Sequence, residues 1–527
     1  MAHLLTVRAN SYKDSIRLLE ATRAVLGAPG VQWGWALMAT PANLATLAQE
    51  GFSEGLGKAG ANDLVVAVRA EDEARASAAL ETAMELLFGA TAADGGEQQK
   101  AVPDLRAALA ENADTNVAIV SVPGPFAALE AHKALSAGLH VLLFSDNVPL
   151  EDEIALKQRA RALGLLVMGP GAGTAMLGGT GLAFANRVAA GPVGVVAAAG
   201  TGAQEVMSLL DRWGVGVSQV IGLGGRDLSP EVGGMMAEQA IRALDADPET
   251  QAILLVSKPP SPQVAARLLN LPRKPMVASL IGLRQPLPAP ENVSVCNTLE
   301  QGAALTLQRL GHEQPDVVGD LPQQLERALS ALAPTRTRLV GLYSGGTLCY
   351  EAMTIATEHV GPIHSNTPLD KRWTIEAATP ASHVCLDLGE EEYTKGRPHP
   401  MIDTEARMGW LRKQASDPSV AAVLLDVVIG DGAHDDPAGV LAPAAAEVVR
   451  SGAAVVAYVL GTGRDPQGFA AQQRALREVG CIVTNSAARA ALAACALVLR
   501  EPRLVNLSLQ RKFTAPQTHE IAGASAA

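Results

Sequence analysis

Aromatic residues and cysteines are scarce in this sequence. Phe, Trp and Tyr make up 3% of the 527 residues, so a core must be built from Ala, Val and Leu packed closely around glycine turns. The cysteines number five and none stands in CxxC spacing, which excludes the usual zinc-site and disulfide-framework patterns and favours a reducing compartment. They are Cys296, Cys349, Cys385, Cys481 and Cys495.

Long apolar runs and basic clusters are also missing. No stretch of about 18 residues is apolar without a Gly, Pro or charge, and the N-terminal MAHLLTVRANSYKDS lacks the apolar segment of a signal peptide. We therefore expect a soluble cytoplasmic protein with no membrane partner. The 42 basic residues are outnumbered by 54 acidic ones and no Lys/Arg run exceeds two, so we expect no nucleic-acid partner.

Glycine is abundant, with 50 residues, and the apolar pattern predicts several α/β domains. A small α+β module is expected over 1–90, followed by a linker of apolar-poor composition over 89–101. Short apolar runs indicate the strands of this module and amphipathic stretches its helices. The strands are predicted at 4–7, 31–38 and 64–69, and the helices at 13–25, 41–50 and 71–87.

From residue 116 onward, short apolar runs alternate with amphipathic stretches, which predicts parallel strands joined by helices. Two later blocks, beginning at Val193 and Leu339, carry similar landmarks in the same order and are interpreted as a tandem repeat. Glu205 of the first block corresponds to Glu351 of the second, and the second carries insertions, the largest near 362–385. The tail 515–527 is predicted to be flexible.

The sharpest local signal is a strand, a glycine-rich turn and a helix, present once in each block. Backbone N–H groups at such a turn, together with the helix dipole, form a seat for phosphate or carboxylate. The alternative is a tight turn that binds nothing, and its occurrence at equivalent places in both blocks favours function. The predicted anion-binding residues of the two turns are Gly200, Thr201, Gly202, Gly345, Gly346 and Thr347.

Charged residues at predicted strand ends form a second set of candidates, because ligands collect at the carboxyl ends of parallel strands. Arg226, Lys258 and Arg464 are predicted to bind anions, since Lys and Arg neutralise phosphate and carboxylate groups. A loop-closing ion pair of Arg226 with Asp227 is the alternative for the first of these.

Three further residues are predicted to be catalytic: Arg397, His399 and Asp426. His399 suits proton transfer near neutrality, although it stands between two prolines and could instead brace a loop. Asp426 lies inside the apolar run VLLDVVI, so it must be partly buried and needs a partner such as an arginine.

Asp431 is expected at the same sheet edge as Gly346, and the alternative is that the acidic turn 431–436 is solvated or an interface. We predict no metal site there, because His434 has no second histidine at ligand spacing.

Several segments also carry a family resemblance. FSDNVPLEDEIALKQRAR, GLGGRDLSPEVGG, LYSGGTL, YTKGRPHPMID, VLLDVVIGDGA and GTGRDPQ resemble the FdrA family of succinyl-CoA-synthetase-like proteins over nearly the whole chain. The stretch around AAGTGAQE is similar to the α subunit of succinyl-CoA synthetase. The resemblance implies a Rossmann-like CoA-binding-type domain over 103–190 and two tandem flavodoxin-like domains over 191–311 and 337–514.

The sequence departs from the synthetase in three ways. The phosphohistidine loop of the synthetase would lie between Leu280 and Asn297, where this sequence contains no histidine. No segment is long enough for an ATP-grasp domain, and the 1–90 module replaces the glycine-rich loop that opens the CoA domain.

The FdrA resemblance implies a subunit of a catabolic carbamoyltransferase complex in purine and allantoin breakdown, which converts oxalurate and phosphate into oxamate and carbamoyl phosphate. Its partners would be other subunits of that complex, and the protein would be an oligomer. The first alternative is an acyl-CoA synthetase subunit that needs a separate ATP-grasp partner. The second is a non-catalytic scaffold. No cofactor is fixed by the residues; CoA and Mg²⁺ are left open.

Overall fold

The structure is a computed structural model that describes residues 1–13, 15–53, 56, 59–89, 102, 104–258, 260–283, 285, 287–394 and 398–507. Nearly all of the predicted linker 89–101, the whole predicted tail 515–527 and Arg397 lie outside these residues. The chain divides into two compact units, one formed by Met1–Pro103 with Glu391–His399 and the other by the rest of the chain. Among the described residues, no helix is long and apolar enough to cross a membrane.

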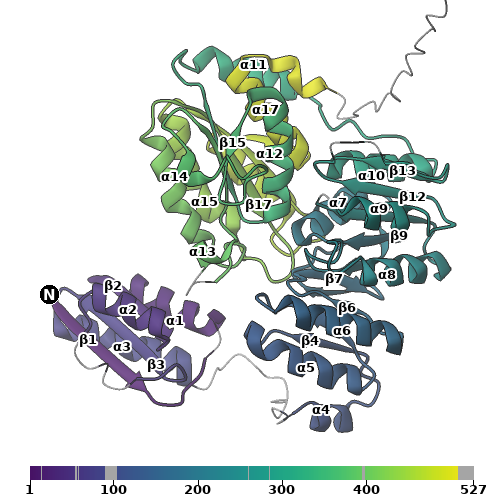
Figure 1. Cartoon of the computed structure of the whole chain (residues 1–527). Coiled ribbons are helices and arrows are strands. Elements are labelled where there is room, and N and C mark those ends of the chain that lie inside the picture. The colour runs from purple at the N-terminus through teal and green to yellow at the C-terminus, as the bar shows by residue number, and fades with distance from the viewer. Residues whose placement is uncertain are drawn as a thin grey trace, which may run out of the picture. The chain divides into compact units, whose positions relative to one another are not determined.

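The N-terminal unit has the predicted strands and helices, each within two residues of its expected bounds. β3 lies between β1 and β2 and runs antiparallel to both. Apolar side chains of α1 and α3 cover one face of this sheet and those of α2 cover part of the other (Figure 1). The elements are β1 (Ala2–Arg8), α1 (Ser15–Gly27), β2 (Val31–Met38), α2 (Pro41–Gln49), β3 (Leu64–Ala70) and α3 (Glu73–Phe88). The short helix α13 (Glu391–Thr394) also belongs to this unit.

The second unit begins with a small parallel sheet of three strands in the order β4-β5-β6. The predicted alternation of strand and helix is confirmed here. The elements are α4 (Leu105–Glu111), β4 (Val117–Val120), α5 (Gly124–Ser136), β5 (His140–Leu143), α6 (Leu150–Leu163) and β6 (Val167–Met168).

The first large sheet has seven strands in the order β13-β12-β11-β9-β10-β7-β8. Its five parallel strands follow the doubly wound order 2-1-3-4-5, with β9 as strand 1. The hairpin of β7 and β8 extends the sheet by antiparallel pairing with β10. The elements are β7 (Thr174–Leu177), β8 (Thr180–Ala183), β9 (Ala190–Ala197), α7 (Gly200–Arg212), β10 (Val217–Gly222), α8 (Met235–Ala246), β11 (Ala252–Ser257), α9 (Pro262–Leu269), β12 (Met276–Leu280), β13 (Val293–Cys296) and α10 (Leu299–Arg309).

The second large sheet has six parallel strands in the order β15-β16-β14-β17-β18-β19. With β14 as strand 1 it repeats the order 2-1-3-4-5, as the repeated landmarks predict, and β15 comes from the insertion near 362–385. The elements are α11 (Leu321–Ala331), β14 (Arg338–Tyr343), α12 (Gly346–Val360), β15 (Ile363–His364), η1 (Ile375–Ala377), β16 (His383–Asp387), η2 (Thr404–Arg407), α14 (Met408–Ala415), β17 (Val420–Val428), α15 (Pro437–Arg450), β18 (Ala454–Leu460), α16 (Phe469–Glu478), β19 (Ile482–Thr484), α17 (Ala487–Leu499) and η3 (Pro502–Asn506).

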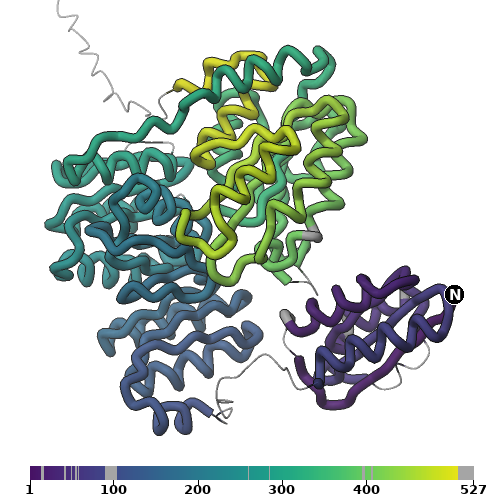
Figure 2. The backbone as a smooth tube through the Cα atoms, turned by 180° about the vertical axis from the view of Figure 1, so that it is seen from behind, coloured from purple at the N-terminus to yellow at the C-terminus, as the bar shows by residue number. Residues whose placement is uncertain are grey.

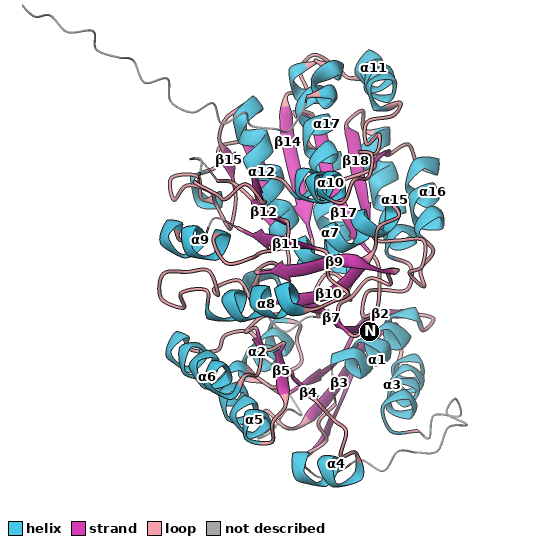
Figure 3. Ribbon diagram, turned by 90° about the vertical axis from the view of Figure 1, so that its right-hand side faces the viewer, coloured by secondary structure: helices cyan, strands magenta, loops and turns pink. Residues whose placement is uncertain are grey.

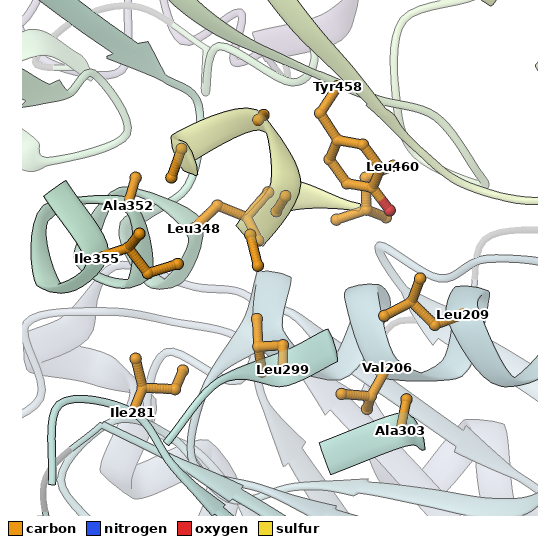
Figure 4. Packing of buried hydrophobic residues seen from close by; sticks show 14 of the residues in the cluster. Val206, Leu209, Ile281, Leu299, Ala303, Leu348, Ala352, Ile355, Tyr458 and Leu460 are labelled. Atoms are coloured by element: carbon orange, nitrogen blue, oxygen red, sulfur yellow. The ribbon is translucent and has the colours of Figure 1, made fainter. Parts of the chain in front are cut away.

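The two large sheets pack through four helices, which we call the junction: α7 and α10 of the first block and α12 and α17 of the second (Figure 3). Their apolar side chains form one continuous buried cluster. Figure 4 shows side chains of α7 and α10 facing those of α12 and β18 in this cluster. α11, which connects the blocks, lies against α17 and η3 near the end of the described chain (Figure 2).

A buried lysine fixes the small sheet's helix α6 to the first large sheet. Lys157 Nζ lies 2.9 Å from Glu153 Oε1 and 2.8 Å from Asp227 Oδ1, and all three side chains are fully buried. The lysine also donates to the carbonyl oxygen of Leu223, at the end of β10. Without the lysine, Asp227 would be a buried charge with no ion-pair partner in the described residues, whereas Glu153 would keep its ion pair with Arg226.

Replacing Lys157 by Met should therefore destabilise the second unit by about 3–5 kcal/mol, because buried Asp227 loses the lysine that pairs with it and Glu153 keeps only the ion pair with Arg226. Lys133→Met is the matched control, since Lys133 forms an exposed pair with Glu130 and should matter little. Thermal unfolding followed by circular dichroism measures both. Equal midpoints for the two variants would contradict this role of the network.

Candidate site where the two glycine turns meet

The two glycine turns predicted from the sequence lie against one another. α7 begins at Gly200 directly after β9, and α12 begins at Gly346 directly after β14. A Cβ atom on Gly202 would lie 2.9 Å from Cγ2 of Thr347, and one on Gly345 would collide with Cγ2 of Thr201. The structure thus brings together all six predicted residues of the turns.

The first N–H groups of both helices are suited to an anion. Within the described residues, neither α7 nor α12 has a side chain that accepts a hydrogen bond at its N-cap. Each N-terminus carries about half a positive charge from its helix dipole. A Cβ on Gly200 would meet no described atom within 4 Å, so the turn of α7 has an open side.

Lys258 adds a full positive charge at the same place. It follows β11 of the first block, and its Nζ lies 3.4 Å from the position of a Cβ on Gly346, the first residue of α12. The ammonium group also lies over the ring of Tyr350, 5.5 Å from the ring centroid. The predicted anion-binding lysine therefore reaches from one block to the helix N-terminus of the other.

Asp387, which the sequence analysis did not single out, also lies beside Gly346. Its Oδ2 is 2.5 Å from the position of a Cβ on that glycine. Burial, together with the charge of Glu390, raises the pKa of Asp387 to about 7, although the Gly389 N–H and Lys258 oppose the shift. Its place at the end of β16, the neighbour of β14, is the signal that could have found it.

Asp426 is buried and has the arginine partner that the sequence predicts. Arg407 Nη2 donates to its Oδ1 at 2.6 Å. Asp426 also accepts from the N–H and Oγ of Ser344, the residue before Gly345. Asp426 therefore holds the turn that opens α12, and its predicted catalytic role stays a prediction.

Two predicted arginines form ion pairs with carboxylates outside the glycine turns. Arg226 Nε lies 2.8 Å from Glu153 Oε2, while Asp227 pairs with Lys157, so these two neighbours do not pair with each other. Arg464 Nε lies 3.3 Å from Oδ1 of Asp211, near the C-terminal end of α7. About 16 Å of helix separates that position from Gly200.

The remaining predicted catalytic residues stay predictions. His399 lies in the segment Glu391–His399, which belongs to the N-terminal unit. Arg397 lies outside the described residues.

Asp431, in the acidic turn after β17, lies at an interface between the second block and the segment that precedes the first block. Asp431 forms a backbone bridge with Ala185 and an ion pair with Arg187, whose Nη2 lies 2.8 Å from Oδ1. Asp465 accepts from the side chain of Asn186 and the N–H of Arg187. In the part of the chain that the structure describes, no three His, Cys, Asp or Glu side chains are grouped to hold a metal ion.

Two buried glutamates, one on α7 and one on α12, each cap a helix of the opposite block. Glu205 of α7 accepts from the N–H of Ala487, the first residue of α17, and from Tyr458 Oη at 2.6 Å. Glu351 of α12 accepts from the N–H of Leu299, the first residue of α10, at 2.6 Å. The sequence signal for this exchange is the glutamate that occurs at corresponding positions of the two blocks, Glu205 and Glu351. Burial raises the pKa of Glu205 to about 7 and that of Glu351 to about 8.

The glutamates predict how stability depends on pH. The carboxyl of Glu351 ionises near 4.5 when unfolded but near 8 when folded, so the unfolded state binds fewer protons between these values and stability falls as pH rises. Glu351→Gln keeps an acceptor for Leu299 without titrating. We expect its melting temperature, relative to the wild type, to increase from about pH 5 to about pH 8 and then level off. Calorimetry with the exposed Glu130→Gln as control tests this, and a pH-independent difference would contradict it.

The contact between the turns predicts opposite outcomes for two glycine substitutions. Gly345→Ala would force its Cβ into Thr201 and should cost about 1–3 kcal/mol through overpacking. Gly200→Ala meets open space and should leave stability nearly unchanged. Chemical denaturation of both variants measures the difference, and the reverse ranking would show that the turns do not touch.

Two family models match separate parts of this chain. Residues 342–497 match the model described as CoA-ligase, which covers the turn and helix α12. Residues 1–103 match the model described as AllF, heavy metal-associated domain. The sequence has no cysteine before Cys296, so this N-terminal segment cannot supply thiolate ligands to a metal.

One relative covers nearly the whole chain and others cover part of it. It is 36% identical over 507 residues to the uncharacterized protein YahF of Escherichia coli strain K12, covering 94% of this chain and 98% of YahF. It is 30% identical over 211 residues to the ADP-forming succinate–CoA ligase subunit alpha 2 of Archaeoglobus fulgidus, covering 38% of this chain and 72% of that subunit. A solved acetyl-coenzyme A synthetase of Ca. Korarchaeum cryptofilum aligns over 77% of this chain and 85% of that one, at 16% identity and a TM-score of 0.27. By these matches the chain belongs to the family of YahF, with an AllF heavy-metal-associated domain at its N-terminus and a CoA-ligase domain, and is related to the α subunit of succinate–CoA ligase.

Proposed function

We propose that this protein is the FdrA-type subunit of a catabolic carbamoyltransferase, in which oxalurate and phosphate are converted into oxamate and carbamoyl phosphate. The FdrA resemblance implies this reaction, and the AllF domain over 1–103 supports a place in the allantoin and oxamate pathway. The subunit names of its succinate–CoA ligase relatives support assembly with other chains.

The observation that carries the proposal is that two helix N-termini and one lysine lie close together. In the described residues, neither N-terminus has a side-chain cap. Gly200 and Gly346 open the two helices, and Lys258 lies beside Gly346. A phosphate dianion placed there would be held by backbone N–H groups from both blocks and by the ammonium group. Positioning and charge neutralisation are what this reaction needs, because phosphate itself is the nucleophile.

The reaction balances without ATP. An oxygen of HPO₄²⁻ attacks the ureido carbonyl carbon of oxalurate, and the bond from that carbon to the inner nitrogen breaks. The phosphate proton ends on the departing nitrogen, so oxamate leaves as a neutral amide and carbamoyl phosphate remains. No phosphohistidine is needed, in agreement with a sequence that has no histidine between Leu280 and Asn297.

The proposal is tested by mixing the full-length chain with its partner subunits, oxalurate and inorganic phosphate. We expect carbamoyl phosphate to form without ATP or CoA, detected by ³¹P NMR or by trapping with ornithine. Formation of an acyl-CoA in the presence of ATP, without carbamoyl phosphate, would overturn the proposal.

Replacing Lys258 by Gln should reduce kcat/KM for phosphate by about 10²–10³, because one full charge is removed from the anion seat. Arg242→Gln removes a charge from an exposed pair on α8 and serves as the control. Steady-state rates of carbamoyl phosphate formation compare them. Equal rates would exclude Lys258 from the site.

The second candidate function is that of an acyl-CoA synthetase subunit, favoured by the CoA-ligase model over 342–497. It requires CoA binding within 110–190 and a separate ATP-grasp chain. Calorimetric titration with CoA separates the two, since micromolar binding supports the ligase.

A scaffold role is tested with Gly346→Val, whose Cβ would lie 2.5 Å from Asp387 Oδ2. Unchanged turnover in the assembled complex would favour the scaffold.

A further inference from the structure

Asp387 is a buried carboxyl at the rim of the anion seat. It ends β16 and is 2% exposed, and its backbone is held by Asn366, which donates to its carbonyl oxygen and accepts from its N–H. Oδ1 accepts from the N–H of Gly389 at 3.0 Å. The other oxygen, Oδ2, is directed at Gly346, where the helix N-terminus and Lys258 also lie.

We propose that Asp387 is a catalytic residue that hands a proton to the departing nitrogen of oxamate. The inference rests on the proposed carbamoyl transfer and adds to it the group that moves the proton. Asp387 lies beside the seat where phosphate would bind, and its rigid backbone fixes Oδ2 there.

The charges around Asp387 suit this role. Lys258 faces Asp387 from the end of β11, and Glu390 faces it from the loop that follows β16. Asp426 faces it from β17, and the charge of Asp426 is neutralised by Arg407. The buried Cys349 thiol of α12 also lies nearby. With a pKa raised to about 7 by burial, the carboxyl is partly protonated at neutrality, and a bound phosphate dianion raises its pKa further.

The step is balanced. As the phosphate oxygen bonds to the ureido carbon, the bond from carbon to nitrogen breaks and the nitrogen takes the proton of the Asp387 carboxyl. The Asp387 carboxylate then takes the proton of the phosphate. Beyond oxalurate and phosphate, neither an oxidant nor a further reactant is required, and the enzyme returns to its starting state.

Asp426 cannot replace Asp387 in this step. Both of its oxygens are engaged by Ser344, and Oδ1 is also bound by Arg407.

The first test compares Asp387→Asn with the wild type in the reconstituted complex, with rates and phosphate binding measured separately. We expect kcat to fall by about 10²–10⁴, whereas inorganic phosphate binds equally or more tightly because a negative charge is gone. Thermal unfolding shows whether the variant is folded. A kcat near that of the wild type would overturn the role of Asp387, and so would a parallel loss of phosphate binding in a folded variant.

The second test uses Glu390→Gln, which changes the pKa of Asp387 and leaves the Asp387 side chain itself unaltered. The proton donor must be protonated, so the rate falls as pH rises through its pKa. Removing the negative charge of Glu390 lowers that pKa and should shift the alkaline limb of the pH–rate profile to lower pH at an unchanged maximal rate. Glu130→Gln is the matched control on an exposed helix. An unshifted limb would overturn the inference.

The two proposals fail differently. A wild-type complex that makes no carbamoyl phosphate overturns both. A wild-type complex that makes it, with Asp387→Asn equally fast, overturns only the role of Asp387.

Discussion

The contact between the two glycine turns is the constraint on which the second unit depends. Thr201 fills the space that a side chain on Gly345 would need, and Thr347 does the same opposite Gly202. Only hydrogen at these glycines allows the helix N-termini to approach so closely. The approach places two sets of N–H groups and Lys258 around one region, which neither block could achieve alone.

The exchange of glutamates reinforces this approach at an energetic cost. Glu205 and Glu351 each satisfy the first N–H of a helix in the other block, so the blocks complete one another's hydrogen bonding. Burial of the two carboxyls, which raises both pKa values to neutrality or above, opposes this gain. The apolar cluster of the junction supplies the compensating stability. A buried ion pair of Glu300 with Arg489 further ties α10 to α17.

Much of the fold follows from local pattern. The N-terminal elements were predictable because their apolar periodicities change between two and 3.6 residues at clear turns. Asp426 was predictable as a buried acid with an arginine partner, since an unpaired charge inside VLLDVVI would be too costly. Arg226 and Arg464 show the limit of such reasoning, because a position after a strand does not say which carboxylate a long side chain reaches.

The sequence by itself determined the α/β class, the repeated landmarks of the two blocks, the two glycine turns and the absence of a histidine between Leu280 and Asn297, because each is written in residue type and spacing. Only the tertiary structure decided that the turns meet, that Lys258 reaches α12 and that Asp387 stands beside Gly346. The reason is physical. Periodicity tells which face of a helix is apolar, but many dockings can bury such a face. The docking that this chain adopts depends on close contacts between glycines and threonines of different blocks, such as Gly345 with Thr201, which lie far apart in the sequence.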